Sequence, residues 1–298
     1  MKNPFWNRDE RRLRAGWRIL LLLVATAVAS FLAYGPLAAI PGVAGRGVRF
    51  AYLILAFLAL WAVARFIDRR SLADLGLSGR DRGDFLAGFA MSVGVIGLLA
   101  LAFRALGWVE WEVRPATESS LPLWLSLAVQ LLLFAVAAVY EETLSRGYLI
   151  RNLAEGWNSG GRSRPWALGA AWIVSSLLFA LMHAANPEAG RLGFVNLTLL
   201  GAIFALPFLA RGALAMPVGL HLGWNLAIGP LLGLPVSGGA PPVSLLAAGV
   251  RGPERWLGGA FGPESGLGAT AAALVLAVLV VVWLRWRHPE VAGVERRA

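Results

Sequence analysis

The sequence LLLFAVAAVYEETLSR, residues 131–146, decides the fold, because two adjacent carboxylates and an arginine end a run that is otherwise apolar. An ionisable side chain at the centre of a membrane costs at least ~2.5 kcal/mol on insertion scales. Such a residue is therefore expected where it has both a task and a partner. Glu141 and Glu142 predict a functional site within a membrane-spanning segment, with a polar partner close by.

The composition extends this prediction to the whole chain. Of its 298 residues, 58% are hydrophobic and 15% are charged, whereas soluble proteins carry about 25% charged residues. Apolar windows recur at the length of roughly 20 residues that crosses a bilayer, without the alternation of a membrane barrel. Backbone groups in hydrocarbon must be satisfied internally, so the spans are predicted to be helices. We predict an all-α polytopic membrane bundle of eight transmembrane helices, at residues 16–34, 48–67, 85–106, 122–150, 165–185, 193–210, 214–231 and 267–286.

The charge pattern predicts the location of the chain. The net charge of +10 comes almost entirely from arginine, with Lys2 as the only lysine. The arginines gather in particular loops, which is typical of membrane orientation and not of a nucleic-acid partner. We predict an integral protein of the cell (inner) membrane, in contact with the lipid bilayer, with both termini cytoplasmic. The absence of cysteine excludes disulfides, thiolate metal sites and a catalytic thiol.

The chain is predicted to form one integral membrane domain with three parts. Residues 1–121 form the N-terminal helices and loops, residues 122–231 the core that holds the polar residues, and residues 232–298 a Gly/Pro-rich loop, the last helix and a basic tail. The loop has no helical period, so we expect an ordered or re-entrant surface loop or a lid, and most simply a plain connector. The segment 71–84 is predicted to contain a short amphipathic surface helix.

Helical spacing assigns different tasks to the two glutamates. Glu142 and Arg146 are four residues apart and share a helix face, whereas Glu141 points roughly 100° away from Glu142. The Glu142–Arg146 pair would fix the helix and leave Glu141 to face a cavity as a general base. The alternative is a purely structural ion pair near the membrane surface, which leaves Glu141 unexplained.

Two further apolar segments contain the polar residues that could join Glu141. His183 follows Phe179 by four residues, a pattern that by itself is also typical of a hydrogen-bonded core histidine. His221 and Asn225 share a helix face, and Gly219 and Gly223 beside them would let another helix approach closely.

These side chains also predict a metal site. Two imidazoles and one carboxylate are the ligands of catalytic His₂Glu zinc sites, in which a fourth position holds an activated water. The compact motif His-Glu-x-x-His is absent from the sequence. A divalent metal, most simply zinc, would therefore need Glu141, His183 and His221 from three separate helices.

Three motifs together resemble a known family. They lie in order within residues 122–231, and the match resembles the CPBP family, the CAAX-protease and bacteriocin-processing group of intramembrane endopeptidases also called Abi. The motifs are Glu141-Glu142-x-x-x-Arg146, Phe179-x-x-x-His183 and His221-x-x-x-Asn225.

The resemblance implies a role for each residue. It makes Glu141 and His183 the pair that activates the hydrolytic water, and it makes His221 and Asn225 the groups that stabilise the tetrahedral oxyanion. Eukaryotic relatives cleave the last three residues from prenylated CAAX proteins, so the implied substrate is a membrane-associated protein or peptide, lipidated ones included. The resemblance leaves open whether the water is bound to a metal or is activated by the glutamate without one.

The predicted topology conflicts with this site in one respect. Straight spans would place His183 near the non-cytoplasmic end of its helix and both Glu141 and His221 nearer the middle of the membrane. With a rise of ~1.5 Å per residue, the difference in depth would exceed ~10 Å. Strong helix tilt, or a helix that begins deeper than its sequence suggests, would remove it.

Two other functions fit the same residues. Carboxylates and imidazoles at membrane depth also build the proton relays of coupled transporters, although the chain lacks the internal repeat that marks many transporter folds. A non-catalytic membrane scaffold or immunity protein that retains the site is the other alternative. The interpretation we favour is an intramembrane endopeptidase that attacks a peptide carbonyl with an activated water.

Overall fold

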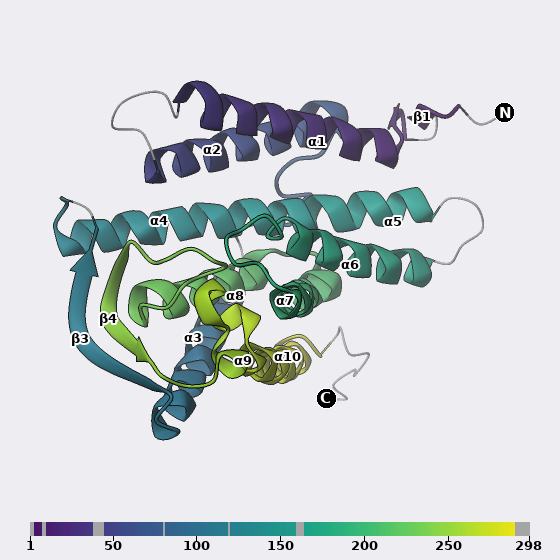
Figure 1. Cartoon of the computed structure of the whole chain (residues 1–298). Helices are drawn as coiled ribbons and strands as arrows, with labels where there is room; N and C mark the ends of the chain where they lie inside the picture. The colour runs from purple at the N-terminus through teal and green to yellow at the C-terminus, as the bar shows by residue number, and fades with distance from the viewer. Residues whose placement is uncertain are drawn as a thin grey trace. The chain divides into compact units, whose positions relative to one another are not determined.

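The computed structural model describes residues 3–7, 10–37, 45–79, 81–118, 120–158 and 164–289 (Figure 1). The predicted basic tail beyond residue 289 lies outside the described residues. The described part is mainly helical, and it includes seven helices long and apolar enough to cross a membrane. The predicted all-α membrane fold is thereby confirmed. These helices are Ala15–Gly35, Gly47–Ile67, Arg82–Ala105, Leu123–Trp157, Arg164–Leu181, Arg191–Arg211 and Leu267–Arg287.

The predicted spans differ from the helices in three places. The fourth helix continues past residue 150 to Trp157. Its last turns are polar, so the apolar pattern in the sequence ends before the helix does. The fifth predicted span, residues 165–185, is helix α6 (Arg164–Leu181), so His183 lies in the turn that follows it. The seventh predicted span is the short helix α8 (Ala215–Leu226), which passes into a π-helical turn at Ala227–Leu231.

The chain divides into two compact units that alternate along the sequence. The first unit contains residues 1–78 and 136–175, and the second contains residues 79–135 and 176–298. Helix α4 (Leu123–Glu142) and helix α6 (Arg164–Leu181) each contribute to both units.

The first unit packs its N-terminal helices together. Helix α1 (Ala15–Leu32) contacts α2 (Arg46–Ala62) and α5 (Arg151–Trp157), and the short antiparallel strands β1 (Trp6–Asn7) and β2 (Arg12–Leu13) precede it. Helix α2 continues as the π-helical turn η2 (Val63–Ile67). Helix α5 follows a longer π-helical segment, η3 (Thr143–Ile150).

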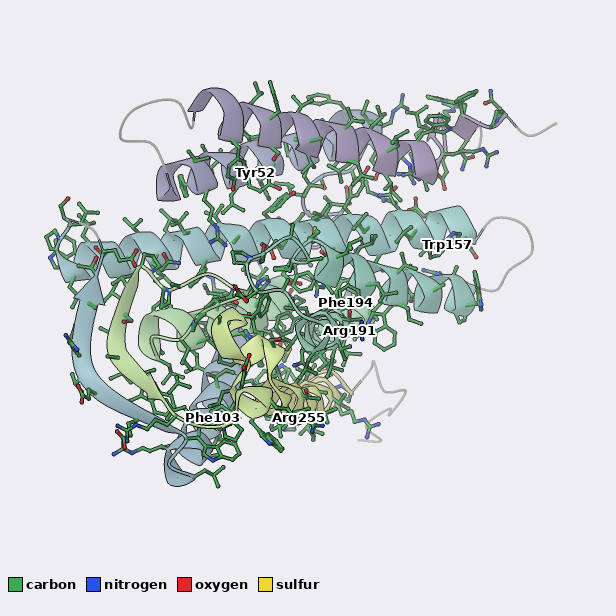
Figure 2. All side chains as sticks on the ribbon, viewed as in Figure 1. Tyr52, Phe103, Trp157, Arg191, Phe194 and Arg255 are labelled. Atoms are coloured by element: carbon green, nitrogen blue, oxygen red, sulfur yellow. The ribbon has the colours of Figure 1, made fainter. Side chains whose placement is uncertain are left out.

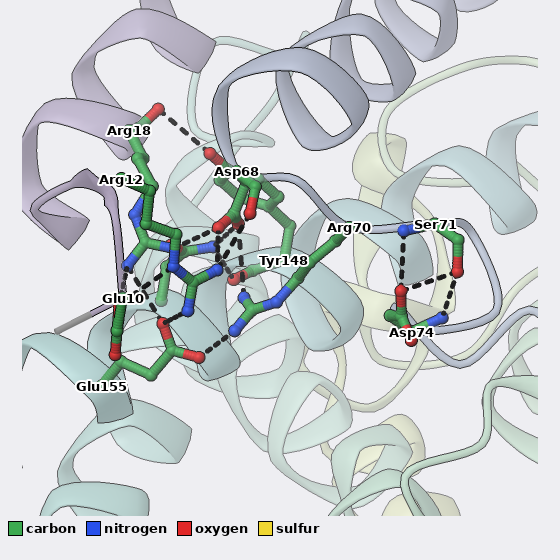
Figure 3. Close-up of polar contacts among 10 residues, drawn as sticks. Glu10, Arg12, Arg18, Asp68, Arg70, Ser71, Asp74, Tyr148 and Glu155 are labelled. Atoms are coloured by element: carbon green, nitrogen blue, oxygen red, sulfur yellow. Dashed lines mark hydrogen bonds and ion pairs between the residues drawn. The ribbon is translucent and has the colours of Figure 1, made fainter.

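A buried ion cluster joins the ends of these helices (Figure 3). Arg18, which is 1% exposed, pairs with Asp68 and lies 3.0 Å from Glu155, while Arg12 lies 2.6 Å from Asp68. Arg70 pairs with both acids. The arginines that mark membrane orientation in the sequence therefore also hold α1, the segment after α2 and α5 together.

The predicted surface helix in residues 71–84 is wrong. Its first residues form a turn, in which Asp74 accepts hydrogen bonds from the Ser71 backbone N–H at 2.8 Å and hydroxyl at 2.7 Å. These bonds lower the pKa of Asp74. Gly76 then adopts a φ of +99°, which ends the turn, and helix α3 begins only at Arg82. Side-chain to backbone bonds of this kind compete with helix formation.

The second unit is built around α8. Leu220 and Trp224 of this helix are buried among side chains of α3 (Arg82–Ala105), α7 (Arg191–Arg211) and α10 (Leu267–Arg287). A Cβ at Gly219 or Gly223 would collide with the backbone of Phe85 or Phe89 on α3. The predicted close helix approach at these two glycines is confirmed, and the partner is α3.

The loops of the second unit contain a two-stranded sheet. Strand β3 (Val109–Thr117) pairs antiparallel with β4 (Val243–Val250), from Val109 opposite Val250 to Thr117 opposite Val243, and Figure 1 shows them side by side. The segment after residue 232 also forms α9 (Glu254–Leu257) and two short 3₁₀ turns, Gly259–Phe261 and Pro263–Ser265. The segment is ordered, as one alternative predicted, and whether it serves as a connector or as a lid stays a prediction. The partner strand lies more than a hundred residues away, so no local pattern reveals it.

We predict that Gly223→Ala destabilises the chain because the added methyl group has no room against Phe89. Overpacking of this kind costs about 1–3 kcal/mol. Thermal denaturation of the purified protein in detergent measures it. Gly97→Ala is the matched control, since a Cβ at Gly97 in α3 meets nothing within 4 Å. Equal midpoints for the two variants would contradict the close packing of α3 and α8.

Candidate functional site

The predicted site residues are distributed over both units. Glu141, Glu142 and Arg146 belong to the first unit, and His183, His221 and Asn225 belong to the second. Each group is described within its own unit.

Glu142 and Arg146 form the predicted ion pair. Arg146 Nε lies 3.1 Å from Glu142 Oε2, and the two side chains are 1% and 0% exposed. Glu142 is the last residue of α4, and Arg146 lies in the π-helical segment η3. Both charges are removed from solvent, so each is tolerated because the other is present. Short π-helical segments are frequent at functional sites.

Glu141 has a different environment from Glu142. Its side chain is half-buried, whereas Glu142 is fully buried, as expected for neighbours on different helix faces. Two tyrosines that the sequence analysis did not single out interact with each other and with the charge of Glu141. They are Tyr140 of α4 and Tyr52 of α2, the latter labelled in Figure 2. The signal for Tyr140 in the sequence is its place directly before Glu141.

The two histidines meet on one aromatic ring. The Phe179 ring centroid lies 5.1 Å from that of His183 and 5.8 Å from that of His221. Phe204 of α7 covers His221 from a further side, at 5.7 Å. The predicted difference in depth is therefore wrong for His183 and His221. Straight full-length spans are the faulty premise, because α6 ends before His183 and α8 is a short helix.

The backbone fixes the orientation of His183. Its Nδ1 lies 2.9 Å from the carbonyl oxygen of Phe179. A carbonyl oxygen only accepts hydrogen bonds, so Nδ1 carries the proton in the neutral ring and Nε2 carries the lone pair. An imidazole oriented in this way can act as a base or as a metal ligand through Nε2. Phe179, four residues before His183, thus contributes both the aromatic ring that packs on the imidazole and the carbonyl oxygen that orients it.

His221 and Asn225 lie four residues apart within α8. His221 is 5% exposed and Asn225 is 9% exposed. An imidazole N–H and an amide N–H in such surroundings can stabilise developing negative charge more strongly than the same groups in water. The glycine contacts with α3 hold the helix that carries both side chains.

Sequence reasoning missed a buried carboxylate in the second unit. Glu264 is 2% exposed and accepts a hydrogen bond from Trp224 Nε1 at 3.1 Å. Ser237 donates to its other oxygen through the backbone N–H and the hydroxyl. The signal in the sequence is one acidic residue between Gly262 and Gly266, in a segment with little charge and no helical period.

The donor set fits the predicted metal in part. His183 and His221 each contact the Phe179 ring, and imidazole nitrogens are common ligands of zinc. Glu141, the predicted third ligand, belongs to the other unit. Within either unit, the residues that the structure describes include no group of three or more His, Asp or Glu side chains placed to hold a metal ion. The metal stays a prediction.

Comparison with known proteins agrees with the motifs. No curated protein and no solved structure gave a significant match to the chain. The family described as Type II CAAX prenyl endopeptidase Rce1-like matches residues 122–227, about a third of the chain. All six predicted site residues, from Glu141 to Asn225, fall inside the matched segment. Residues 122–227 are thus similar to the Rce1-like family of type II CAAX prenyl endopeptidases.

Proposed function

We propose that this protein is an intramembrane endopeptidase that hydrolyses a peptide bond of a membrane-associated protein or peptide. The observation that carries the proposal is the placement of His183 and His221 on the ring of Phe179, within the segment that matches a CAAX-protease family. The seven apolar helices provide the membrane setting. The joint action of Glu141 with the histidines is supported by the order of the three motifs and by the family match.

The proposed chemistry begins with a water held between Glu141 and His183. The Glu141 carboxylate takes one proton while the water oxygen attacks the peptide carbonyl carbon, and Nε2 of His183 accepts a hydrogen bond from the same water. The carbonyl π electrons move to oxygen, where His221 and Asn225 donate hydrogen bonds to the oxyanion. Collapse of the intermediate breaks the C–N bond, and the amine leaves with the proton returned from Glu141.

In the second form of this proposal, the protein uses a divalent metal, most simply zinc. Glu141, His183 and His221 would hold it. When bound, such an ion lowers the pKa of a coordinated water toward neutrality. In that form the Phe179 carbonyl keeps Nδ1 of His183 protonated, so that the ring presents Nε2 as the ligand atom. Asn225 then remains as the donor to the oxyanion.

The proposed substrate is presented from the lipid bilayer, and the family description extends the class to prenylated C-terminal peptides. The arginines that gather in particular loops support an orientation with both termini cytoplasmic, in the cell (inner) membrane. This orientation requires an even number of crossings, so α8 with the turn Ala227–Leu231 would form an eighth crossing beside the seven apolar helices.

The first test is cleavage of membrane-anchored peptides, with and without a prenyl group, by the purified protein in detergent. Glu141→Gln and His183→Ala are each expected to lower the rate by about 10²–10⁴-fold, the usual contribution of acid–base catalysis. Glu112→Gln, on the exposed face of β3, serves as the control and should keep the wild-type rate. Full activity in both site variants would contradict the mechanism. Flux of a solute into proteoliposomes without any cleavage would identify a transporter.

Metal analysis of the purified protein tests the second form independently of activity. Stoichiometric zinc in the wild type, lost in both His183→Ala and His221→Ala, is the expected result if the imidazoles are ligands. Active wild type that contains no metal would instead assign the chemistry to Glu141 and His183 alone.

The Glu142–Arg146 pair is expected to be structural support for Glu141. Arg146→Met leaves a buried carboxylate without its cation, which costs about 3–5 kcal/mol. Replacing both residues, as Glu142→Met with Arg146→Met, removes the lone charge and should recover much of the lost stability. Thermal denaturation of the three proteins in detergent measures this. A double variant as unstable as Arg146→Met would show that the pair does not act as a unit.

A further inference from the structure

The carboxylate of Glu264 is the centre of a buried network in the second unit. Its Oε1 accepts from the indole N–H of Trp224, and its Oε2 accepts from the N–H and the hydroxyl of Ser237, at 2.5 and 2.8 Å. Among the described residues, no arginine or histidine forms an ion pair with it. A buried carboxylate is unfavourable unless several donors satisfy it, so its presence in the short turn Pro263–Ser265 calls for a reason.

The backbone around Glu264 is also held in place. Asn196 of α7 donates through Nδ2 to the carbonyl oxygens of Glu264 and Gly266, at 2.8 and 2.9 Å. Its Oδ1 accepts from the hydroxyl of Thr270 on α10 at 2.7 Å. The backbone at Glu264 is thus held by Asn196 of α7, which is itself bound to Thr270 of α10, and neither helix carries a predicted site residue.

The same segment also contacts residues next to the two histidines. Phe261, three residues before Glu264, packs with Phe179 in one buried cluster, and Phe179 is the ring that both imidazoles contact. Asn186, which follows His183 by three residues, donates through Nδ2 to the carbonyl of Ser237 at 2.9 Å. The segment from Ser237 to Glu264 therefore contacts the elements that carry His183 and His221.

We propose that Glu264 is a positioning residue that sets the rotation of α8 and thereby the placement of His221 and Asn225. Trp224 directly precedes Asn225 and lies three residues after His221, so a bond to its indole restrains the helix close to both side chains. The glycine contacts with α3 fix the distance of α8 from its neighbour, and the Glu264–Trp224 bond fixes its rotation. This inference rests on the proposed function, in which these two residues stabilise the oxyanion.

Trp224→Phe and Glu264→Gln test the proposal on the full-length protein. Phenylalanine keeps an aromatic ring in the core and removes only the indole donor. Glutamine keeps one oxygen, which cannot serve both Trp224 and Ser237. Each variant should lower kcat on the cleaved peptide about 10-fold or more with little change in KM, because the oxyanion donors shift. The double variant should be no slower than the slower single variant, since both remove the same bond.

Two controls separate positioning from a general structural effect. Ser237→Ala removes one bond on the loop side of Glu264 and leaves the Trp224 bond intact, so it should keep a kcat close to wild type. Glu110→Gln, which breaks an exposed ion pair with Arg251 on the β3–β4 sheet, should also be unchanged. If Ser237→Ala lowers kcat as much as Trp224→Phe does, Glu264 anchors only the loop and the proposal is overturned.

A second readout does not depend on catalysis. The chain has only three histidines, so NMR spectra of the protein with ¹⁵N-labelled histidine contain signals of His183, His221 and His288 alone. The proposal expects the His221 signals to shift in Trp224→Phe and Glu264→Gln, with those of His288 unchanged. Unshifted His221 signals in a folded Trp224→Phe variant would overturn it. If the wild type cleaves no peptide but the two variants still show the His221 shifts, the proposed function is contradicted and the positioning role stays supported.

Discussion

Charged groups buried in an apolar bundle must be satisfied by partners, and this constraint explains the polar interior of the protein. In the first unit, Arg146 pairs with Glu142, and Asp68 gathers three arginines at the helix ends. In the second unit, Glu264 is satisfied by neutral donors. Because an isolated charge is so unfavourable in these surroundings, each partner restricts where its helix can lie. The same contacts that allow the charges thus help to fix the helices that carry the candidate site.

In the second unit, two aromatic residues contact the predicted functional groups or the helix that carries them. Phe179 supplies a ring to both imidazoles and a carbonyl to His183 Nδ1, so one residue aligns two predicted functional groups. Trp224 connects α8 to the buried Glu264. Preorganised donors and acceptors of this kind are what hydrolysis of a peptide bond requires, because they need not reorganise as charge develops.

Much of the fold could be predicted from the sequence because membrane helices follow from local composition. The pair Glu142–Arg146 and the close approach at Gly219 and Gly223 also follow from helical spacing. The rest depends on contacts between distant segments. Strands β3 and β4 pair across more than a hundred residues. The role of Glu264 likewise depends on its hydrogen bonds with the distant residues Trp224 and Ser237. Straight spans predict different depths for His183 and His221, which is wrong because α6 ends before His183 and α8 is short.

The central claim is that Glu141 and His183 act on the same water. The chain has no cysteine, so Glu141→Cys combined with His183→Cys introduces the only two thiols. Treatment of this variant in membranes with a short bifunctional thiol reagent, followed by mass spectrometry of the peptides, measures whether the two positions meet. The account predicts an intramolecular link between residues 141 and 183. No link, although each cysteine alone reacts with a monofunctional reagent, would contradict it.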